Sequence, residues 1–86
     1  MDRKLILNNI EIQDSYVLRN GSMLFVYVYA EITFAELFNI LNDPANVQTV
    51  RAFVGETETD YDGYTELFVI RKEDEGFISA GLRKPV

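Results

Sequence analysis

The side chains best suited to chemistry lie in one acidic segment, residues 56–66, which contains five carboxylates and no basic residue. Its acids and interleaved tyrosines are Glu56, Glu58, Asp60, Tyr61, Asp62, Tyr64 and Glu66. The first four acids occupy alternate positions, so in an extended chain they would line one face at intervals of about 6.6–6.8 Å. A row of carboxylates of this kind can bind a cation, contact a basic surface or remain in water.

Calcium binding is indicated by only the first half of a motif. The spacing Glu58-x-Asp60-x-Asp62-Gly63 resembles the start of an EF-hand loop, in which oxygen ligands alternate before a glycine at the sharp turn. The bidentate Glu expected six residues after that glycine is Val69 in this chain, and the flanking segments have the pattern of strands. We therefore predict no metal site.

Recognition of a protein is the functional interpretation that the segment favours. Tyr61 and Tyr64 would act as anchors on a basic partner surface, and the acids would set approach and specificity. Carboxylates at this spacing could also imitate nucleic-acid phosphates, which follow one another every ~3.4 Å along a strand, and so form an acidic decoy. A third alternative is a solvated hairpin arm that only keeps the protein in solution.

The expected shape of the arm is the same in all three cases. We expect it to project from the sheet as a hairpin or long loop, with Asp62-Gly63 at or near its turn. The carboxylates should be mostly exposed, because unpaired acids are costly to bury.

The chain lacks the side chains on which most enzymes rely. It contains no Cys and no His, so there is no thiolate and no imidazole to act as nucleophile, base or zinc ligand. Ser15, Ser22 and Ser79 therefore have no His partner, and the isolated glycines form no phosphate loop. We predict a protein that is not an enzyme, without catalytic residues and without a cofactor.

The bulk composition indicates one small domain, residues 1–86, with 48% apolar and 13% aromatic residues. The net charge of −6 makes nucleic acid and anionic membranes poor direct partners and a basic protein surface a better one. No stretch approaches the roughly 20 apolar residues of a membrane helix, and the N-terminus has no secretory signal. We expect a soluble protein in a reducing or redox-indifferent compartment.

A single helix is predicted over residues 34–42. Thr33 and Glu36 have the spacing of a capping box, and Asn42 followed by Pro44 ends the segment. An apolar stripe at helical spacing should pack on a sheet, with Leu37 and Phe38 buried. The stripe consists of Phe34, Leu37, Phe38 and Leu41.

Seven strands are predicted around this helix, with two-residue hairpin turns at Asn8-Asn9 and Asn20-Gly21. The strands are residues 4–7, 10–12, 16–18, 23–30, 47–54, 64–71 and 77–84. Short connections favour antiparallel neighbours. The expected fold class is α+β: a twisted antiparallel sheet that could curl toward a barrel, with one short helix across a face and the order ββββαβββ.

The strand at residues 23–30 is apolar on both faces. One face carries Met23, Phe25, Tyr27 and Tyr29 and the other Leu24, Val26, Val28 and Ala30. It is either a central strand covered on both sides or a strand whose aromatic face meets another subunit. On the second interpretation, we expect the protein to self-associate or to dock through this face.

Three short motifs carry a resemblance to a group of proteins. They are Thr33-Phe34-Ala35-Glu36-Leu37 with Asn42-Asp43-Pro44, then Tyr61-Asp62-Gly63-Tyr64-Thr65-Glu66-Leu67, then Ile78-Ser79-Ala80-Gly81-Leu82-Arg83-Lys84. With these motifs the chain resembles small uncharacterised proteins from the structural-gene regions of tailed bacteriophages and Gram-positive prophages. The resemblance implies a structural role in the virion or a role in its assembly. The protein would act in the virion, for example in its tail, or in the bacterial host cytoplasm.

Two functional hypotheses follow. The first is a non-enzymatic, phage-type structural or assembly module that acts by protein–protein contacts with a basic partner surface or with itself as a homo-oligomer. The alternative is a small acidic phage-borne inhibitor of a host defence enzyme that reads nucleic acid, whose basic groove the acidic segment would enter.

Overall fold

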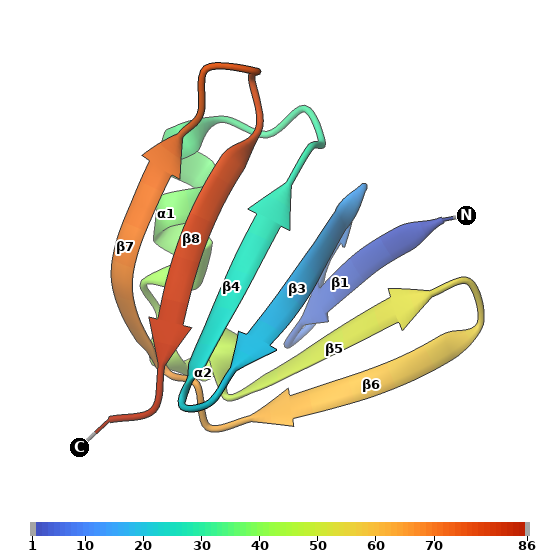
Figure 1. Cartoon of the computed structure of the whole chain (residues 1–86), viewed down its shortest axis with the longest axis vertical. Coiled ribbons are helices and arrows are strands. Elements are labelled where there is room, and N and C mark those ends of the chain that lie inside the picture. The colour runs from blue at the N-terminus through green and yellow to red at the C-terminus, as the bar shows by residue number, and fades with distance from the viewer. Residues whose placement is uncertain (1, 86) are drawn as a thin grey trace.

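The computed structural model describes residues 2–85 as eight strands and two short helices (Figure 1). In chain order they are β1 (Arg3–Leu7), β2 (Ile10–Gln13), β3 (Ser15–Asn20), β4 (Met23–Val28), α1 (Phe34–Leu41), α2 (Pro44–Val47), β5 (Thr49–Val54), β6 (Thr57–Asp62), β7 (Glu66–Lys72) and β8 (Ile78–Arg83). The α+β class and the antiparallel pairing are confirmed. Two elements were not predicted: the strand β6, which contains most of the acidic segment, and the helical turn α2.

The strands form two sheets rather than one. The first sheet has the order β2-β1-β5-β6 and the second the order β3-β4-β8-β7, both antiparallel throughout. The chain passes between them at Asp14, through the two helices, and at Gly63; Asp14 and Gly63 have φ angles of 49° and 86°, which break the extended backbone. The expectation of one sheet curling toward a barrel is therefore wrong, because the described strands pair as two separate four-stranded sheets.

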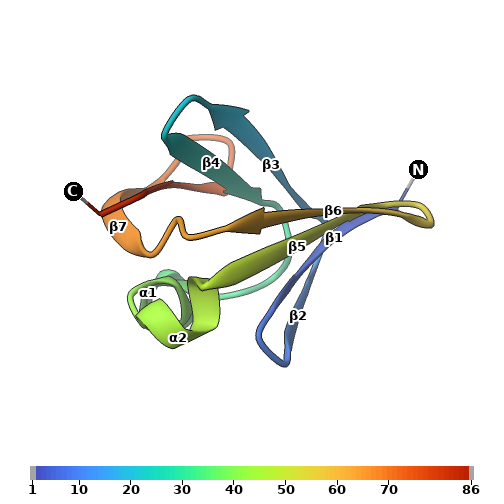
Figure 2. The same cartoon turned by 90° about the horizontal axis from the view of Figure 1, so that it is seen from below.

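The two sheets splay apart and the helices occupy the open side between them (Figure 2). The inner faces of both sheets and the helices share one hydrophobic core. Its fully buried members include Leu5, Leu7 and Val50 from the first sheet, Leu24, Val26 and Leu82 from the second, and Leu37, Leu41 and Val47 from the helices. One face of each sheet is thus used by the core, which leaves the two outer faces in contact with solvent.

The helix α1 begins at the predicted residue, but fewer of its apolar side chains are buried than predicted. The Glu36 backbone N–H donates to the Thr33 hydroxyl at 3.1 Å, while the Glu36 carboxylate accepts from that hydroxyl rather than from the Thr33 N–H. Leu37 and Leu41 are buried, but Phe34 and Phe38 are 40% and 37% exposed. The prediction that Phe38 is core is wrong, because the helix packs on the core through Leu37, Ile40 and Leu41 and leaves Phe38 beside them in solvent.

The predicted turn after α1 is the short helix α2. The Asp43 carboxylate accepts from the Ala45 N–H at 3.0 Å, and Pro44 fills the first helical position, where no N–H is needed. Val47 at its end is buried in the core. The two helices therefore lead the chain from β4 in the second sheet to β5 in the first.

Candidate functional site

The acidic segment is mostly an edge strand, which forms a hairpin with β5 and not a long loop. β6 pairs with β5 along its whole length, from Val54 opposite Thr57 to Thr49 opposite Asp62. The tight turn of this hairpin is at Gly55 and Glu56, where Gly55 has a φ of 61°. The predicted turn at Asp62-Gly63 is instead the crossing from the first sheet to the second. Within β6 the acids Glu58, Asp60 and Asp62 are exposed, while Thr59 and Tyr61 lie opposite Ala52 and Val50 of β5.

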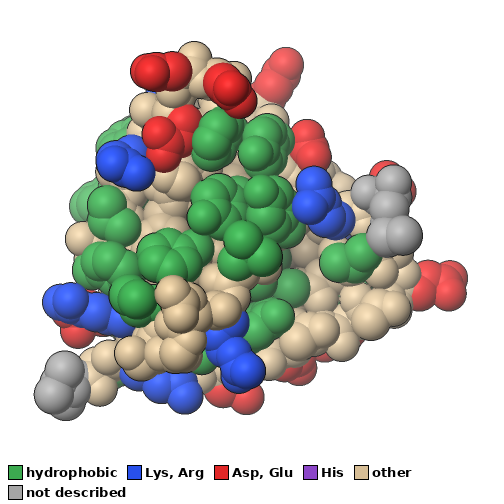
Figure 3. Space-filling view, viewed as in Figure 1, with side chains coloured by type: hydrophobic (Ala, Val, Ile, Leu, Met, Phe, Trp, Pro, Cys, Tyr) green, Lys and Arg blue, Asp and Glu red, His purple; other side chains and the backbone are tan. Residues whose placement is uncertain are grey.

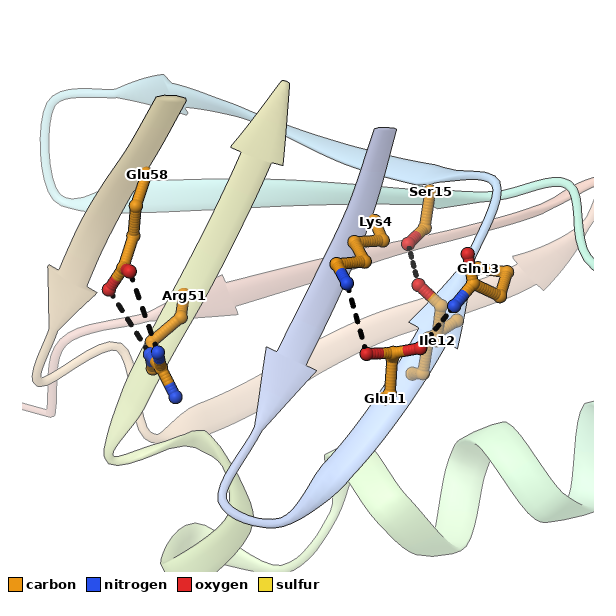
Figure 4. Close-up of polar contacts among 7 residues, drawn as sticks. All are labelled: Lys4, Glu11, Ile12, Gln13, Ser15, Arg51 and Glu58. Atoms are coloured by element: carbon orange, nitrogen blue, oxygen red, sulfur yellow. Dashed lines mark hydrogen bonds and ion pairs between the residues drawn. The ribbon is translucent and has the colours of Figure 1, made fainter. Parts of the chain in front are cut away.

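The carboxylates of β6 differ in their partners. Glu58 accepts from Arg51 Nε at 3.1 Å, and Asp62 accepts from the Thr49 hydroxyl at 2.7 Å (Figure 4 shows the first). Hydrogen bonding from Arg51, followed by that from Asp60, lowers the pKa of Glu58. Asp60 has no basic partner among residues 2–85, and hydrogen bonding to Glu58 raises its pKa. The strand thus carries one acid that is ion-paired, Glu58, and one whose ionised form is disfavoured in the fold, Asp60.

The other predicted site residues do not join this row. Tyr61 is half-buried against the core. Tyr64 is only 3% exposed and its hydroxyl donates to the Gly21 carbonyl at 3.3 Å, so the prediction that it anchors a partner is wrong. Glu66 belongs to β7, where it pairs with Arg83 at 2.6 Å. The exposed part of the predicted site is Glu56, Glu58, Asp60 and Asp62.

Polar side chains on the rest of this outer face also pair with one another, across strands and within β2. Lys4 on β1 donates to Glu11 on β2 at 3.1 Å, and Gln13 also donates to Glu11 (Figure 4). Lys4 and Arg51 both lie over the Phe53 ring, at 5.4 and 5.6 Å from its centroid. The outer face of the first sheet is therefore polar, and most of its charges are paired within the chain.

The outer face of the second sheet has the opposite character. It carries six aromatic rings, which we call the aromatic face: Tyr16, Phe25, Tyr27, Tyr29, Phe68 and Phe77. Hydrophobic side chains gather over the middle of this face in the space-filling view (Figure 3). The expectation of an exposed aromatic face built on Phe25, Tyr27 and Tyr29 agrees with this arrangement, since Tyr29 is 46% exposed and the other two are half-buried.

Close ring contacts join the members of the aromatic face. Tyr16 stacks on Tyr27 with centroids 5.0 Å apart, and Tyr29 stacks on Phe77 at 4.8 Å. Phe25 meets Phe68 edge to face at 6.4 Å. Because neighbouring rings stack on each other, a partner would meet their edges and the tyrosine hydroxyls more than their faces.

A glycine makes room for part of this surface. A Cβ atom on Gly81 would lie 2.6 Å from Phe68 Cζ and 2.8 Å from Val69 Cγ1. A bulge between Leu67 and Val69 turns both Phe68 and Val69 to the outer side. The ring of Phe68 can therefore lie directly on the β8 backbone and reach Phe25 on β4.

Three rings of the aromatic face were not found from the sequence. Tyr16 lies opposite Tyr27 in the β3–β4 hairpin, so the turn at Asn20-Gly21 and its register could have located it. Phe77 lies in the loop before β8, and Phe68 points outward only because of the bulge. No local sequence signal identifies either of these two positions.

Arginines border the aromatic face. The Arg3 guanidinium lies 4.2 Å from the Tyr16 ring centroid, and that of Arg83 lies 5.2 Å from the Phe68 centroid. Aromatic side chains and Arg are the residue types enriched in protein interfaces. The face thus has the composition of a contact surface, with an apolar centre and a charged margin.

Comparisons with protein-family models, with curated proteins and with solved structures find no match for this chain. Within residues 2–85, no helix has the length and apolarity needed to cross a membrane. The same residues contain no group of three or more metal-ligating side chains placed to hold an ion. The candidate site therefore rests on the geometry of the two outer faces alone.

Proposed function

We propose that this chain is a non-enzymatic structural or assembly module that acts by protein–protein contact through the aromatic face. The observation that supports this proposal is the gathering of six aromatic rings on an outer face that no other helix or strand of residues 2–85 covers. Water is a poor solvent for such a surface, and contiguous apolar patches on small proteins mark interaction sites. On the other outer face most charges are already paired within the chain, so contact with a partner would stabilise that face less.

The phage-type setting belongs to the same proposal. It is supported by the resemblance of the three motifs to proteins encoded among bacteriophage structural genes, which is an argument from gene neighbourhood. A protein that works only by contact in a virion or during assembly requires a docking surface and no catalytic group. Both features agree with an aromatic face in a chain without Cys or His.

Site-specific photocrosslinking tests which surface contacts a partner. Benzoylphenylalanine would replace Tyr29 on the aromatic face, Phe38 on the helix or Glu58 on β6, in cells that also produce the products of the neighbouring genes. Phe38 is the matched control because it is an exposed aromatic residue outside the face. We expect discrete adducts from position 29 and none from position 38. Equal adducts from both positions, or none from position 29, would contradict the proposal.

The second candidate function is inhibition of a host enzyme that reads nucleic acid. It is favoured by the exposed acids of β6, an edge strand whose outer side no strand of the described chain covers. Crosslinks from position 58 and not from position 29 would support this candidate. Binding should then weaken steeply with salt, whereas a contact made by aromatic rings should not.

A further inference from the structure

A groove follows the free edge of β2. It has a volume of about 350 Å³ and lies between β2 on one side and residues 30–32 with α1 on the other. All four residues of β2 line it, although Ile12 is buried on the core side and Glu11 and Gln13 are exposed. A groove that reaches residues from both faces of a strand must follow the edge of that strand. β2 and α1 lie on the same side of the molecule (Figure 2).

The backbone of β2 directs hydrogen-bonding groups into this groove. β2 is an edge strand, and within the described chain only β1 pairs with it. Leu7 and Ile10 flank the two-residue turn of the β1–β2 hairpin, so they form the hydrogen-bonded pair that closes it. The direction of the N–H and C=O groups alternates along an antiparallel strand. Those of Ile12 therefore also point to β1, and those of Glu11 and Gln13 point to the free edge.

The walls of the groove are apolar and its margin is acidic. Ile10, Ile32 and Ile40 line it, and all three are half-buried against the core. Glu31 and Glu36 also line it, and neither forms an ion pair within residues 2–85. No Lys or Arg is among its described lining residues. The groove is thus suited to apolar side chains accompanied by positive charge.

Two other edge strands are less suited to backbone pairing. β6 carries three exposed acids, and β7 contains a bulge. Charged side chains and bulges are features that protect sheet edges from added strands. β2 pairs with β1 without a bulge and contains no proline, and its one charged side chain, Glu11, is already paired with Lys4. The edge of β2 is therefore open to a further strand.

We propose that this groove binds an extended segment of a partner protein, which adds to the free edge of β2 and has apolar side chains at alternate positions with Lys or Arg between them. The backbone of the segment pairs with the outward N–H and C=O groups of β2. Its apolar side chains fill the groove against Ile32 and Ile40, and its basic side chains reach Glu31 and Glu36. Strand addition to an exposed sheet edge is a recurring mode of peptide recognition. The inference goes beyond the proposed function, because none of these lining residues belongs to the aromatic face.

A basic segment fits this edge better than a second copy of the chain does. Two β2 edges paired with each other would bring Glu31 and Glu36 of both copies together, with no basic lining residue to offset the repulsion. The four residues of β2 span only about 13 Å. A free peptide also loses conformational freedom when it binds, so we expect a dissociation constant on the order of 100 μM.

Titration with a synthetic peptide tests the occupant. The peptide has eight residues, alternating Val and Lys, with both termini blocked, and calorimetry measures its binding. A second peptide with Glu in place of Lys should bind at least about tenfold more weakly. The absence of binding at several millimolar of the Val–Lys peptide, or equal binding of the two peptides, overturns the proposal.

A pair of matched variants tests the place of binding. Glu31→Lys reverses a charge in the groove, and Glu56→Lys makes the same change at the β5–β6 turn on the opposite side of the first sheet. Glu31→Lys should weaken binding of the Val–Lys peptide at least about fivefold, and Glu56→Lys should have a much smaller effect. Equal effects would mean that the peptide is attracted only by the net charge of the protein, which overturns the proposal. Circular dichroism establishes that both variants are folded.

Amide hydrogen exchange tests strand addition without any substitution in the protein. With the Val–Lys peptide at about ten times its dissociation constant, exchange at the Glu11 and Gln13 N–H groups should slow about tenfold. Exchange at Ile10 and Ile12 should change less, because their N–H groups already bond to β1. Unchanged exchange at Glu11 and Gln13 overturns the proposal. So does protection that rises with protein concentration in the absence of peptide, because a second copy would then occupy the edge.

Backbone methylation of the peptide provides the last control. Only one edge of an added strand faces β2, so N-methylation of one alternate set of peptide residues should weaken binding at least about tenfold more than N-methylation of the other set. Equal effects of the two sets overturn the proposal. If the peptide does not bind while benzoylphenylalanine in place of Tyr29 still crosslinks a partner, this inference is wrong and the proposed function stands.

Discussion

The two outer faces of the molecule differ in how far each satisfies its own side chains. On the first sheet, Arg51 pairs with Glu58, Lys4 with Glu11, and Thr49 with Asp62, each across neighbouring strands. On the second sheet the rings stack on one another, yet Tyr29 and Phe68 remain 46% and 36% exposed. Most charged side chains of the first face are already paired within the chain, while the second face retains apolar surface that a partner can remove from water.

The difference shows that a run of charge in the sequence does not reveal which outer face retains exposed apolar surface. The acidic segment is the most conspicuous feature of the sequence, and its carboxylates are largely engaged in cross-strand pairs of the kind that stabilise many exposed sheets. The aromatic residues are scattered along the chain and become one surface only when β3, β4, β7 and β8 come together. A comparison of outer faces therefore requires the folded topology.

The largest expected effect tests whether the two sheets share one hydrophobic core. Leu5 on the first sheet and Leu24 on the second are both fully buried. Leu5→Ala and Leu24→Ala should each lower the free energy of unfolding by about 2–5 kcal/mol, because each leaves a cavity in the same cluster. Chemical denaturation measures both. Two separate unfolding transitions, one sensitive to each substitution, would show that the sheets do not share a core.

The second prediction concerns the packing that holds the aromatic face together. Gly81→Ala should lower the free energy of unfolding by about 1–3 kcal/mol, because the added methyl group meets the Phe68 ring and Val69. The cost should fall when Phe68→Ala is already present, since the ring that obstructs the methyl group has gone. A double-mutant cycle in denaturant measures this coupling. Independent effects of the two substitutions would mean that Phe68 does not lie on Gly81.

Features set by neighbouring residues could be predicted from the sequence. The helix at residues 34–41 follows from Thr33 and its apolar spacing, and the first hairpin follows from Asn8, which adopts a φ of 59°. The alternation in β4 also correctly separated the buried Leu24, Val26 and Val28 from an outer aromatic row. Local propensity and side-chain period are sufficient for these features.

Features set by distant pairing could not be predicted. The acidic segment becomes a strand because the backbone of β5 pairs with it, and the bias of its acids toward loops gave no indication of that partner. Tyr64 is buried because the chain crosses between sheets at Gly63, a consequence of the two-sheet topology. For the candidate site, the sequence therefore located one row of the aromatic face and the exposure of the β6 acids, but it placed the turn of the acidic hairpin at Asp62-Gly63 instead of Gly55-Glu56.

The third prediction concerns the helix that closes the space between the two sheets. Thr33→Ala should lower the free energy of unfolding by about 1 kcal/mol, because the Glu36 N–H loses its acceptor at the helix N-terminus. Because the helix contributes to the core of both sheets, one shared transition should shift. Tyrosine fluorescence and far-ultraviolet circular dichroism should report the same midpoint. A midpoint that differs between the two signals would assign the helix to one sheet only.

The smallest expected effects lie on the charged face and have opposite signs at neighbouring residues. The pKa of Glu58 is lowered in the fold, so its ionised form stabilises the protein above the unfolded pKa, and this contribution is lost as the pH falls through the folded value. The pKa of Asp60 is raised, so its ionisation destabilises the protein as the pH rises above the ordinary range of an Asp. At neutral pH, Glu58→Gln should therefore lower the free energy of unfolding slightly, and Asp60→Asn should raise it slightly. Both differences should shrink at a pH low enough to protonate these carboxyls in the folded and unfolded states.

Arg51→Gln provides the control for this pair, because Arg51 is the group that hydrogen-bonds Glu58. In that background Glu58→Gln should lose its penalty. Asp60→Asn should keep its benefit, since the benefit comes from relief of the Glu58–Asp60 interaction. Thermal unfolding across acid and neutral pH measures Glu58→Gln and Asp60→Asn in both backgrounds, each against its own parent. Equal effects of Glu58→Gln and Asp60→Asn at neutral pH would mean that the Arg51–Glu58 pair does not form in solution. The acids of β6 would then be free for a basic partner, and the contrast between the two outer faces would weaken in favour of the inhibitor hypothesis.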